Sequence, residues 1–105
     1  MVLNTHTSTI EDDLVKVKEI VLSGLEEYSV KVYLFGSQAT GTAKPTSDID
    51  IAIWPLTPVP EQVFINISQA LEKSAVLLPV ELVDTSTGDD TLRERVLREG
   101  ILWRE

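Results

Sequence analysis

Two aspartates spaced by one residue are the part of this sequence with the clearest chemical potential. Asp48 and Asp50 open the run Asp-Ile-Asp-Ile-Ala-Ile-Trp. Because successive side chains of a strand point to opposite faces, both carboxylates should project from one face, roughly 6 to 7 Å apart along the backbone. Two like charges at that distance repel each other unless a cation lies between them. The pair therefore predicts a site for magnesium, a hard cation that prefers oxygen ligands.

A Gly-Ser pair upstream supplies a candidate phosphate site. Residues 30–35 form a β-branched and aromatic run, typical of a buried strand, and Gly36-Ser37 ends it. Residues 38–40 can form a short helical turn before Gly41, so the backbone N–H groups near Ser37 should point outward at a helix start, where they could bind an anion. A triphosphate held at this turn would present its oxygens to a metal ion bound by the aspartates.

A third carboxylate interrupts the apolar stretch 78–83, which predicts another strand. Val80 and Leu82 should point to one face of this strand, whereas Glu81 should point to the other. A carboxylate inside an otherwise apolar strand needs a physical reason, and the structural one is an edge-strand acid that faces water or discourages further strand pairing.

The first two motifs also have purely structural interpretations. Gly36-Ser37 could be an ordinary turn at the end of a strand, and Asp48 with Asp50 could form a solvated strand face. Their joint occurrence favours the functional interpretation. Trp54 should lie on the aspartate side of its strand, where it could stack on a nucleotide base or cover the margin of the core.

Length and composition narrow the classes of function. A chain of 105 residues corresponds to one domain, 1–105, in which we expect 1–8 to be a disordered leader, and it leaves no room for a second substrate-binding domain. Nine basic against 17 acidic residues give a net charge of −8, which disfavours gripping a long nucleic acid. Without cysteine, and without an apolar run long enough to span a membrane, the sequence predicts a cytoplasmic protein.

The remaining segments should position these residues. Apolar residues recur at spacings of three and four along three stretches, which predicts amphipathic helices with one core-facing side. These helices are expected at about 10–27, 61–74 and 89–98, with Gly100 ending the last one before a short terminal segment, 101–103. The order of elements predicts an α/β (α+β) fold, a small mixed β-sheet flanked by helices that cover it on one side.

In combination, the motifs resemble the minimal nucleotidyltransferases of the DNA polymerase β-like superfamily. The resemblance extends over nearly the whole chain, and its specificity comes from the order, spacing and strand placement of the motifs together. It rests on Gly36-Ser37, Gly41, Ser47-Asp48-Ile49-Asp50-Ile51 and Glu81. The polymerase β-like nucleotidyltransferase fold is therefore expected.

The resemblance implies a magnesium-dependent enzyme that transfers a nucleoside monophosphate, with ATP as the expected donor of AMP, onto a hydroxyl acceptor. By position, Gly36 and Ser37 would grip the triphosphate, and Asp48 and Asp50 would bind two divalent ions. Glu81 would help to hold one metal and would deprotonate the attacking hydroxyl. Such transfer depends mostly on positioning and on neutralising the developing charge, which two metals can provide.

Two positions depart from the family pattern. The basic residue usually found just before the second glycine is replaced by Thr40, and Lys44 could supply the missing phosphate counter-charge. The third acid is commonly aspartate, whereas Glu81 is one methylene longer, which shifts the metal geometry and keeps the charge.

The resemblance also implies a protein partner, because stand-alone modules of this size are often paired with a small helical HEPN protein. In such pairs the module is the antitoxin and can adenylylate the toxin, an RNase, on tyrosine. The alternative is a catalytically weak or inactive binding module that neutralises a HEPN partner by complex formation. Thr40 favours this alternative, and the intact aspartates at 48 and 50 argue against it.

Overall fold

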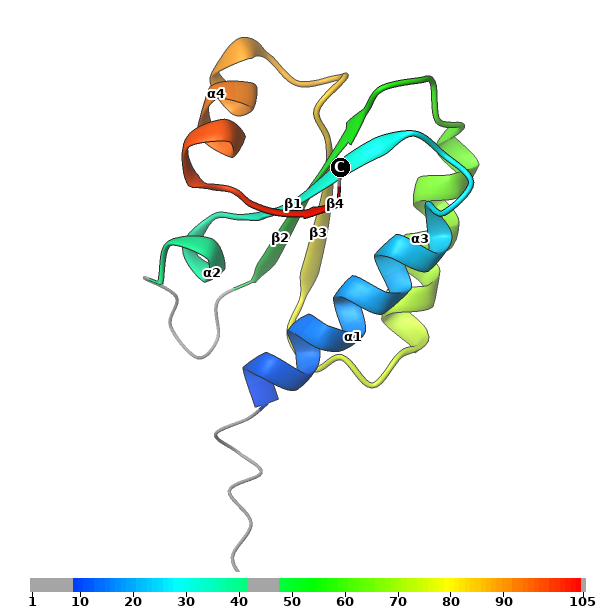
Figure 1. Cartoon of the computed structure of the whole chain (residues 1–105). Helices are drawn as coiled ribbons and strands as arrows, with labels where there is room; N and C mark the ends of the chain where they lie inside the picture. The colour runs from blue at the N-terminus through cyan, green and yellow to red at the C-terminus, as the bar shows by residue number, and fades with distance from the viewer. Residues whose placement is uncertain (1–8, 42–47, 105) are drawn as a thin grey trace, which may run out of the picture.

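The computed structural model of the chain describes residues 9–41 and 48–104, so the expectations for the leader 1–8, for Lys44 and for Ser47 lie outside the described part. Four helices alternate with four strands within it (Figure 1). In chain order these are α1 (Thr9–Gly24), β1 (Val30–Phe35), α2 (Ser37–Thr40), β2 (Ile49–Pro55), α3 (Glu61–Lys73), β3 (Val80–Asp84), α4 (Asp90–Glu99) and β4 (Ile101–Arg104). No helix among these is long and apolar enough to cross a membrane.

The four strands form one mixed sheet in the order β3-β2-β1-β4. Strand β1 pairs antiparallel with both β2 and β4, whereas β2 and β3 run parallel. A parallel pair needs a long crossover connection, and α3 supplies it here. The mixed sheet expected from the sequence is confirmed.

One face of the sheet carries the main core. The isoleucines of β2 point to this face, as the alternation in the sequence predicts, and α1 and α3 cover it (Figure 1). Apolar residues from both helices complete the cluster, so the strand faces are fixed by burial. Its fully buried members include Val17, Val21, Leu25, Ile49, Ile51 and Ile53.

The opposite face is covered by α4, which corrects the expectation that helices lie on one side only. Val96 and the half-buried Leu92 of this helix pack on Tyr33, Phe35 and Ala52, which are buried in a second cluster. The sequence pattern of α4 predicted an apolar stripe but not the face that it covers, because periodicity fixes which side of a helix is buried and not what buries it.

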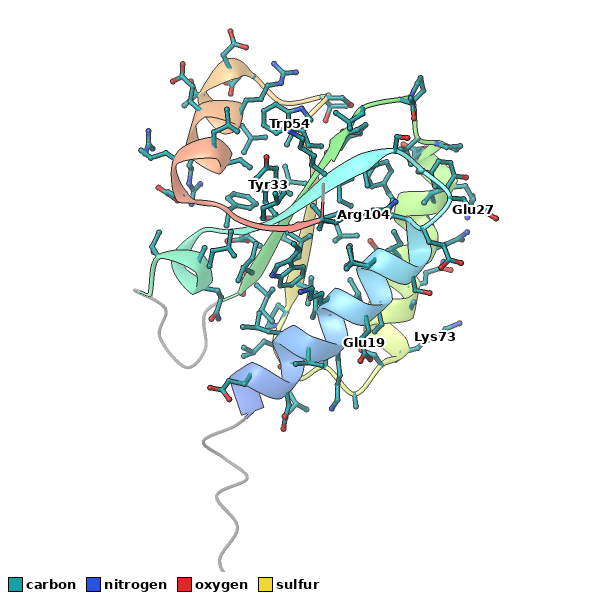
Figure 2. The ribbon with its side chains drawn as sticks, viewed as in Figure 1. Glu19, Glu27, Tyr33, Trp54, Lys73 and Arg104 are labelled. Atoms are coloured by element: carbon teal, nitrogen blue, oxygen red, sulfur yellow. The ribbon has the colours of Figure 1, made fainter. Side chains whose placement is uncertain are left out.

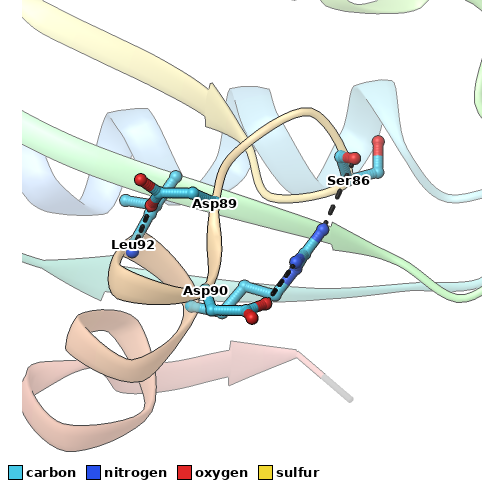
Figure 3. A network of polar contacts seen from close by, with 5 residues as sticks. Ser86, Asp89, Asp90 and Leu92 are labelled. Carbon is cyan, nitrogen blue, oxygen red and sulfur yellow. Dashed lines mark hydrogen bonds and ion pairs between the residues drawn. The ribbon is translucent and has the colours of Figure 1, made fainter.

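The start of α4 is fixed by polar contacts that Figure 3 shows from close by. Asp89 caps the helix by accepting a hydrogen bond from the Leu92 N–H at 3.0 Å. Arg93 donates to Asp90 at 3.1 Å and to the Ser86 carbonyl at 3.5 Å, which ties the helix to the loop after β3. The cap and these bonds hold the helix in place over the sheet.

The expected terminal segment after Gly100 is a fourth strand, β4, on the outer side of β1. Its Arg104 reaches back to the connection between α1 and β1, where the guanidinium donates to the carbonyls of Leu25 at 2.8 Å and Tyr28 at 2.9 Å (Figure 2). These two bonds attach β4 to the segment that follows α1. A run of four residues is too short for periodicity to identify as a strand.

A buried carboxylate on α1 positions the approach to β3. Asp13 is 1% exposed and accepts hydrogen bonds from the backbone N–H groups of Leu77 at 3.0 Å and Leu78 at 2.9 Å. Buried charge is stabilised when hydrogen-bond donors surround it, and here two donors come from the segment that leads into the strand carrying Glu81.

Replacing this carboxylate should destabilise the fold. Asp13→Ala would leave two partly buried N–H groups without an acceptor, at a cost of about 1 to 3 kcal/mol in the free energy of unfolding. Urea denaturation followed by circular dichroism measures this free energy of unfolding. Glu19→Ala, which removes an exposed carboxylate from the same helix, serves as the control and should change stability by less than about 0.5 kcal/mol. Equal effects of the two variants would show that the Asp13 bonds contribute nothing specific.

Candidate functional site

The register of the sheet places two of the three predicted acids next to each other. Asp50 of β2 pairs with Phe35 of β1 on one side and with Glu81 of β3 on the other. Neighbouring strands lie about 4.8 Å apart, so in-register side chains on one face are in direct reach of each other. Phe35, Asp50 and Glu81 therefore form a row across three strands, and we call this the acidic row.

The two carboxylates of the acidic row are close enough for their charges to repel each other. The pKa of Asp50 is raised above its usual value of 3.8, first by partial burial and then by the negative charges of Glu81 and Asp48. A side-chain hydrogen bond with Glu81 raises the pKa further, whereas the positive charge of Arg95 lowers it. A cation bound beside Asp50 would offset the repulsion from the neighbouring carboxylates.

The Gly-Ser turn lies against this row. Gly36 has a φ angle of 77°, a left-handed conformation that favours glycine, and a methyl group at this position would press against Oδ2 of Asp50. Only the absence of a side chain lets the turn approach the carboxylate so closely. The backbone then enters α2 at Ser37. The expected convergence of the turn with the Asp-x-Asp strand is thus present for Gly36 and Asp50.

Thr40 occupies the position where a basic residue was expected. Its backbone N–H and its hydroxyl both donate to the carbonyl of Gly36, at 3.1 and 3.4 Å. Gly41 follows with a φ angle of 78° and ends the short helix. The threonine therefore helps to close the turn.

A cation from α4 stands beside the acidic row, and the sequence analysis missed it. The Arg95 guanidinium lies 5.4 Å from the centroid of the Phe35 ring, and its Nε contacts Oε1 of Glu99 at 3.3 Å. Arg95 is one of several charged residues on an exposed helix, and only knowledge of the face that α4 covers shows that this arginine faces the site.

Comparison with known proteins decides the family. The model of the family described as Polymerase beta, Nucleotidyltransferase matches residues 16–104. The chain belongs to this nucleotidyltransferase family. The match includes the glycine turn, both aspartates and Glu81, and it confirms the resemblance that the sequence motifs suggested.

Individual relatives agree with this assignment. This nucleotidyltransferase is 29% identical over 94 residues to the probable protein adenylyltransferase MntA of Haemophilus influenzae, which covers 90% of the chain and 81% of the relative. A solved structure assigned as a minimal nucleotidyltransferase is 31% identical with a TM-score of 0.68, covering 86% of this chain and 92% of that one. A toxin-antitoxin structure with AMP-PNP is 28% identical with a TM-score of 0.64, covering 82% and 71%.

The described acids of the nucleotidyltransferase offer two adjacent oxygen donors, which is part of the ligand set of a metal ion. Among residues 9–41 and 48–104, no three acidic or histidine side chains are gathered closely enough to hold one ion by themselves. Asp50 and Glu81 are adjacent, and Asp48 is exposed just before β2 begins. Magnesium is commonly held by one or two carboxylates together with substrate phosphates, so this arrangement suits it. Ligation of one ion by all three acids stays a prediction.

Trp54 lies away from the acidic row. It is four residues beyond Asp50, about 13 Å along an extended strand. Its ring packs against Tyr33, with 6.1 Å between the centroids, at the margin of the core under α4 (Figure 2). This is the structural alternative that the sequence left open for the tryptophan.

Neutralising Asp50 should stabilise the nucleotidyltransferase fold at neutral pH. Because folding raises the pKa of this group, its ionisation costs stability, and the cost is complete above the raised pKa and absent below 3.8. Asp50→Asn should raise the free energy of unfolding by about 0.5 to 1 kcal/mol at pH 7, with the gain disappearing as the pH falls towards 3.8. Thermal unfolding across this pH range measures it.

The matched control for that variant is Glu72→Gln, which neutralises an exposed acid on α3 and should leave the pH dependence of stability as in the unmodified chain. A loss of stability at pH 7 in Asp50→Asn would contradict the like-charge repulsion inferred for the acidic row.

Gly36 and Gly41 form a matched pair for testing the close approach of the turn. Both have left-handed φ angles, but an added methyl group meets Asp50 only at Gly36 and none of the described residues at Gly41. Each alanine variant should lose about 1 to 2 kcal/mol through backbone strain. Gly36→Ala should lose at least about 1 kcal/mol more because of overpacking. Chemical denaturation measures both, and equal losses would show that Asp50 does not constrain the turn.

Proposed function

We propose that this nucleotidyltransferase is a magnesium-dependent adenylyltransferase that moves AMP from ATP onto a hydroxyl of a partner protein. The observation that carries the proposal is the in-register pair Asp50 and Glu81 packed against the Gly36 turn. The adenylyltransferase name of the Haemophilus relative and the AMP-PNP complex of another relative support ATP as the donor.

Glu81 would act as the general base for the acceptor hydroxyl. Its carboxylate takes the proton of the attacking hydroxyl, whose oxygen forms a bond to the α-phosphorus while the bond to the β-phosphate oxygen breaks and pyrophosphate leaves. Glu81 lies on an outer strand of the described sheet and is exposed, so an acceptor can approach it from solvent. The pairing of β3 with β2 keeps the backbone of Glu81 beside Asp50.

The donor side would be handled by the turn and by the aspartates. Gly36 and Ser37 would grip the triphosphate through their backbone, and Lys44 would add a counter-charge. Asp48 and Asp50 would hold the metal ions, which when bound offset charge on the attacking and leaving oxygens. The pKa of Asp50 is raised first by burial and then by the charges of Glu81 and Asp48, and a divalent cation would offset the repulsion from these charges.

The partner in this proposal is a HEPN-type toxin in the cytoplasm, with the present chain as its antitoxin. The toxin-antitoxin assembly of a solved relative supports such a pairing. Glu81 lies on an outer strand of the described sheet at the exposed end of the acidic row, where a partner chain would present the acceptor.

The competing function is neutralisation by binding alone, without transfer. Thr40 favours it, because its N–H and hydroxyl are both bonded to Gly36 and it carries no charge for a phosphate. Transfer requires the acidic row, whereas a masking complex does not.

An adenylylation assay separates these two functions. The purified chain is incubated with ATP, magnesium and a HEPN partner, and intact-mass spectrometry records the partner. Transfer predicts the mass increase of one or more AMP groups, and chelating the magnesium should abolish it. A stable complex with an unmodified partner would instead establish masking, and neither transfer nor binding would overturn both functions.

Variants of the acids test the assigned roles in the same assay. Asp48→Asn and Asp50→Asn should abolish metal-dependent ATP binding, because each removes a metal ligand. Glu81→Gln should lower the transfer rate by about 10² to 10⁴-fold with a much smaller change in ATP affinity, as loss of a general base does. Glu72→Gln, on the other side of the sheet, should behave like the unmodified chain. Turnover that persists in the double aspartate variant would contradict the metal assignment.

A further inference from the structure

Arg95 extends the acidic row by one position. The guanidinium lies over Phe35, which pairs in register with Asp50, which in turn pairs with Glu81. A cation, an aromatic ring and two carboxylates thus follow one another across the face of the sheet that α4 covers. Phe35 also directly precedes Gly36, so the arginine stands beside the strand end from which the phosphate turn begins.

The position of this arginine is not explained by the packing of α4. Leu92 and Val96 hold the helix on the sheet, and Asp89 with Arg93 fixes its start. The Arg95 side chain is 48% exposed, and ion pairs of such exposed groups contribute little to stability. Apart from its attraction to Asp50, this half-exposed charge is accessible to a ligand from solvent.

Glu99 holds the arginine in a geometry that a phosphate could take over. The contact uses a single nitrogen, Nε, at 3.3 Å from one carboxylate oxygen. A guanidinium has five N–H donors in a planar fork that matches the oxygens of phosphate, and such bidentate pairs are stronger than a single contact. A triphosphate at the Gly36 turn would compete with Glu99 for Arg95.

We propose that Arg95 is a nucleotide-binding residue that exchanges Glu99 for the β- and γ-phosphates of ATP and supplies the counter-charge that Thr40 lacks. This inference rests on the proposed adenylyltransferase function. It assigns to α4 a role in recognising the triphosphate tail, in addition to covering the sheet.

The test compares dissociation constants of four proteins for ATP with magnesium by isothermal titration calorimetry. Arg95→Gln should weaken binding about 10-fold to 100-fold, as loss of hydrogen bonds to a charged group does. Arg98→Gln is the matched control, since Arg98 lies on the same helix, is 69% exposed and contacts the same Glu99 at 3.8 Å. It should bind as the unmodified chain does. Glu99→Gln should bind more tightly, because it releases Arg95.

Two further measurements separate a role in phosphate binding from a merely structural role. They are the affinity of the variants for AMP and their thermal unfolding. AMP lacks the β- and γ-phosphates, so the affinity of Arg95→Gln for AMP should differ less than about twofold from that of the unmodified chain. The temperature midpoint of unfolding of Arg95→Gln should be close to that of Arg98→Gln. Equal loss of ATP and AMP affinity, ATP affinity within twofold of the unmodified chain, or weakened ATP binding in Glu99→Gln would each overturn the assignment. Absence of ATP binding in the unmodified chain would overturn the adenylyltransferase function as well.

Discussion

The parallel pairing of β2 with β3 holds two carboxylates side by side, and the arrangement of the candidate site depends on this contact. Asp50 and Glu81 are in register, and the pKa of Asp50 is raised by burial and by its acidic neighbours. The fold sustains this unfavourable contact because the other face carries the buried isoleucines of β2 and the half-buried Val80 and Leu82 of β3, which pack into the main core. Burial on one face thus fixes the position of charge on the other.

Much of this arrangement could be predicted from the sequence. Alternation along β2 predicted the face of Asp50, and β1 has the bounds that its β-branched and aromatic run indicated. The place of Glu81 followed from the same period of two. Local periodicity specifies which way a side chain points, and the structure agrees wherever one face of a strand is buried.

The features that the sequence did not reveal depend on contacts between distant segments. Asp13 appears in the sequence as one more acid at the start of an amphipathic helix, yet it is buried against backbone N–H groups that come 64 and 65 residues later. Strand β4 forms by pairing with the side of β1 that does not pair with β2. Arg95 became a candidate only when α4 was found on the face of the acidic row. Such pairings carry no local signal.

The register of β3 has a consequence for natural variation in this family. A slip of one residue past β2 would turn Glu81 to the face of the sheet that α1 and α3 cover and bring Val80 or Leu82 opposite Asp50. The sheet could still form, but Asp50 would no longer have Glu81 beside it. The number of residues between α3 and β3 therefore fixes which side chain lies beside Asp50, and an insertion or deletion of one residue there should disturb the candidate site as a substitution of Glu81 would.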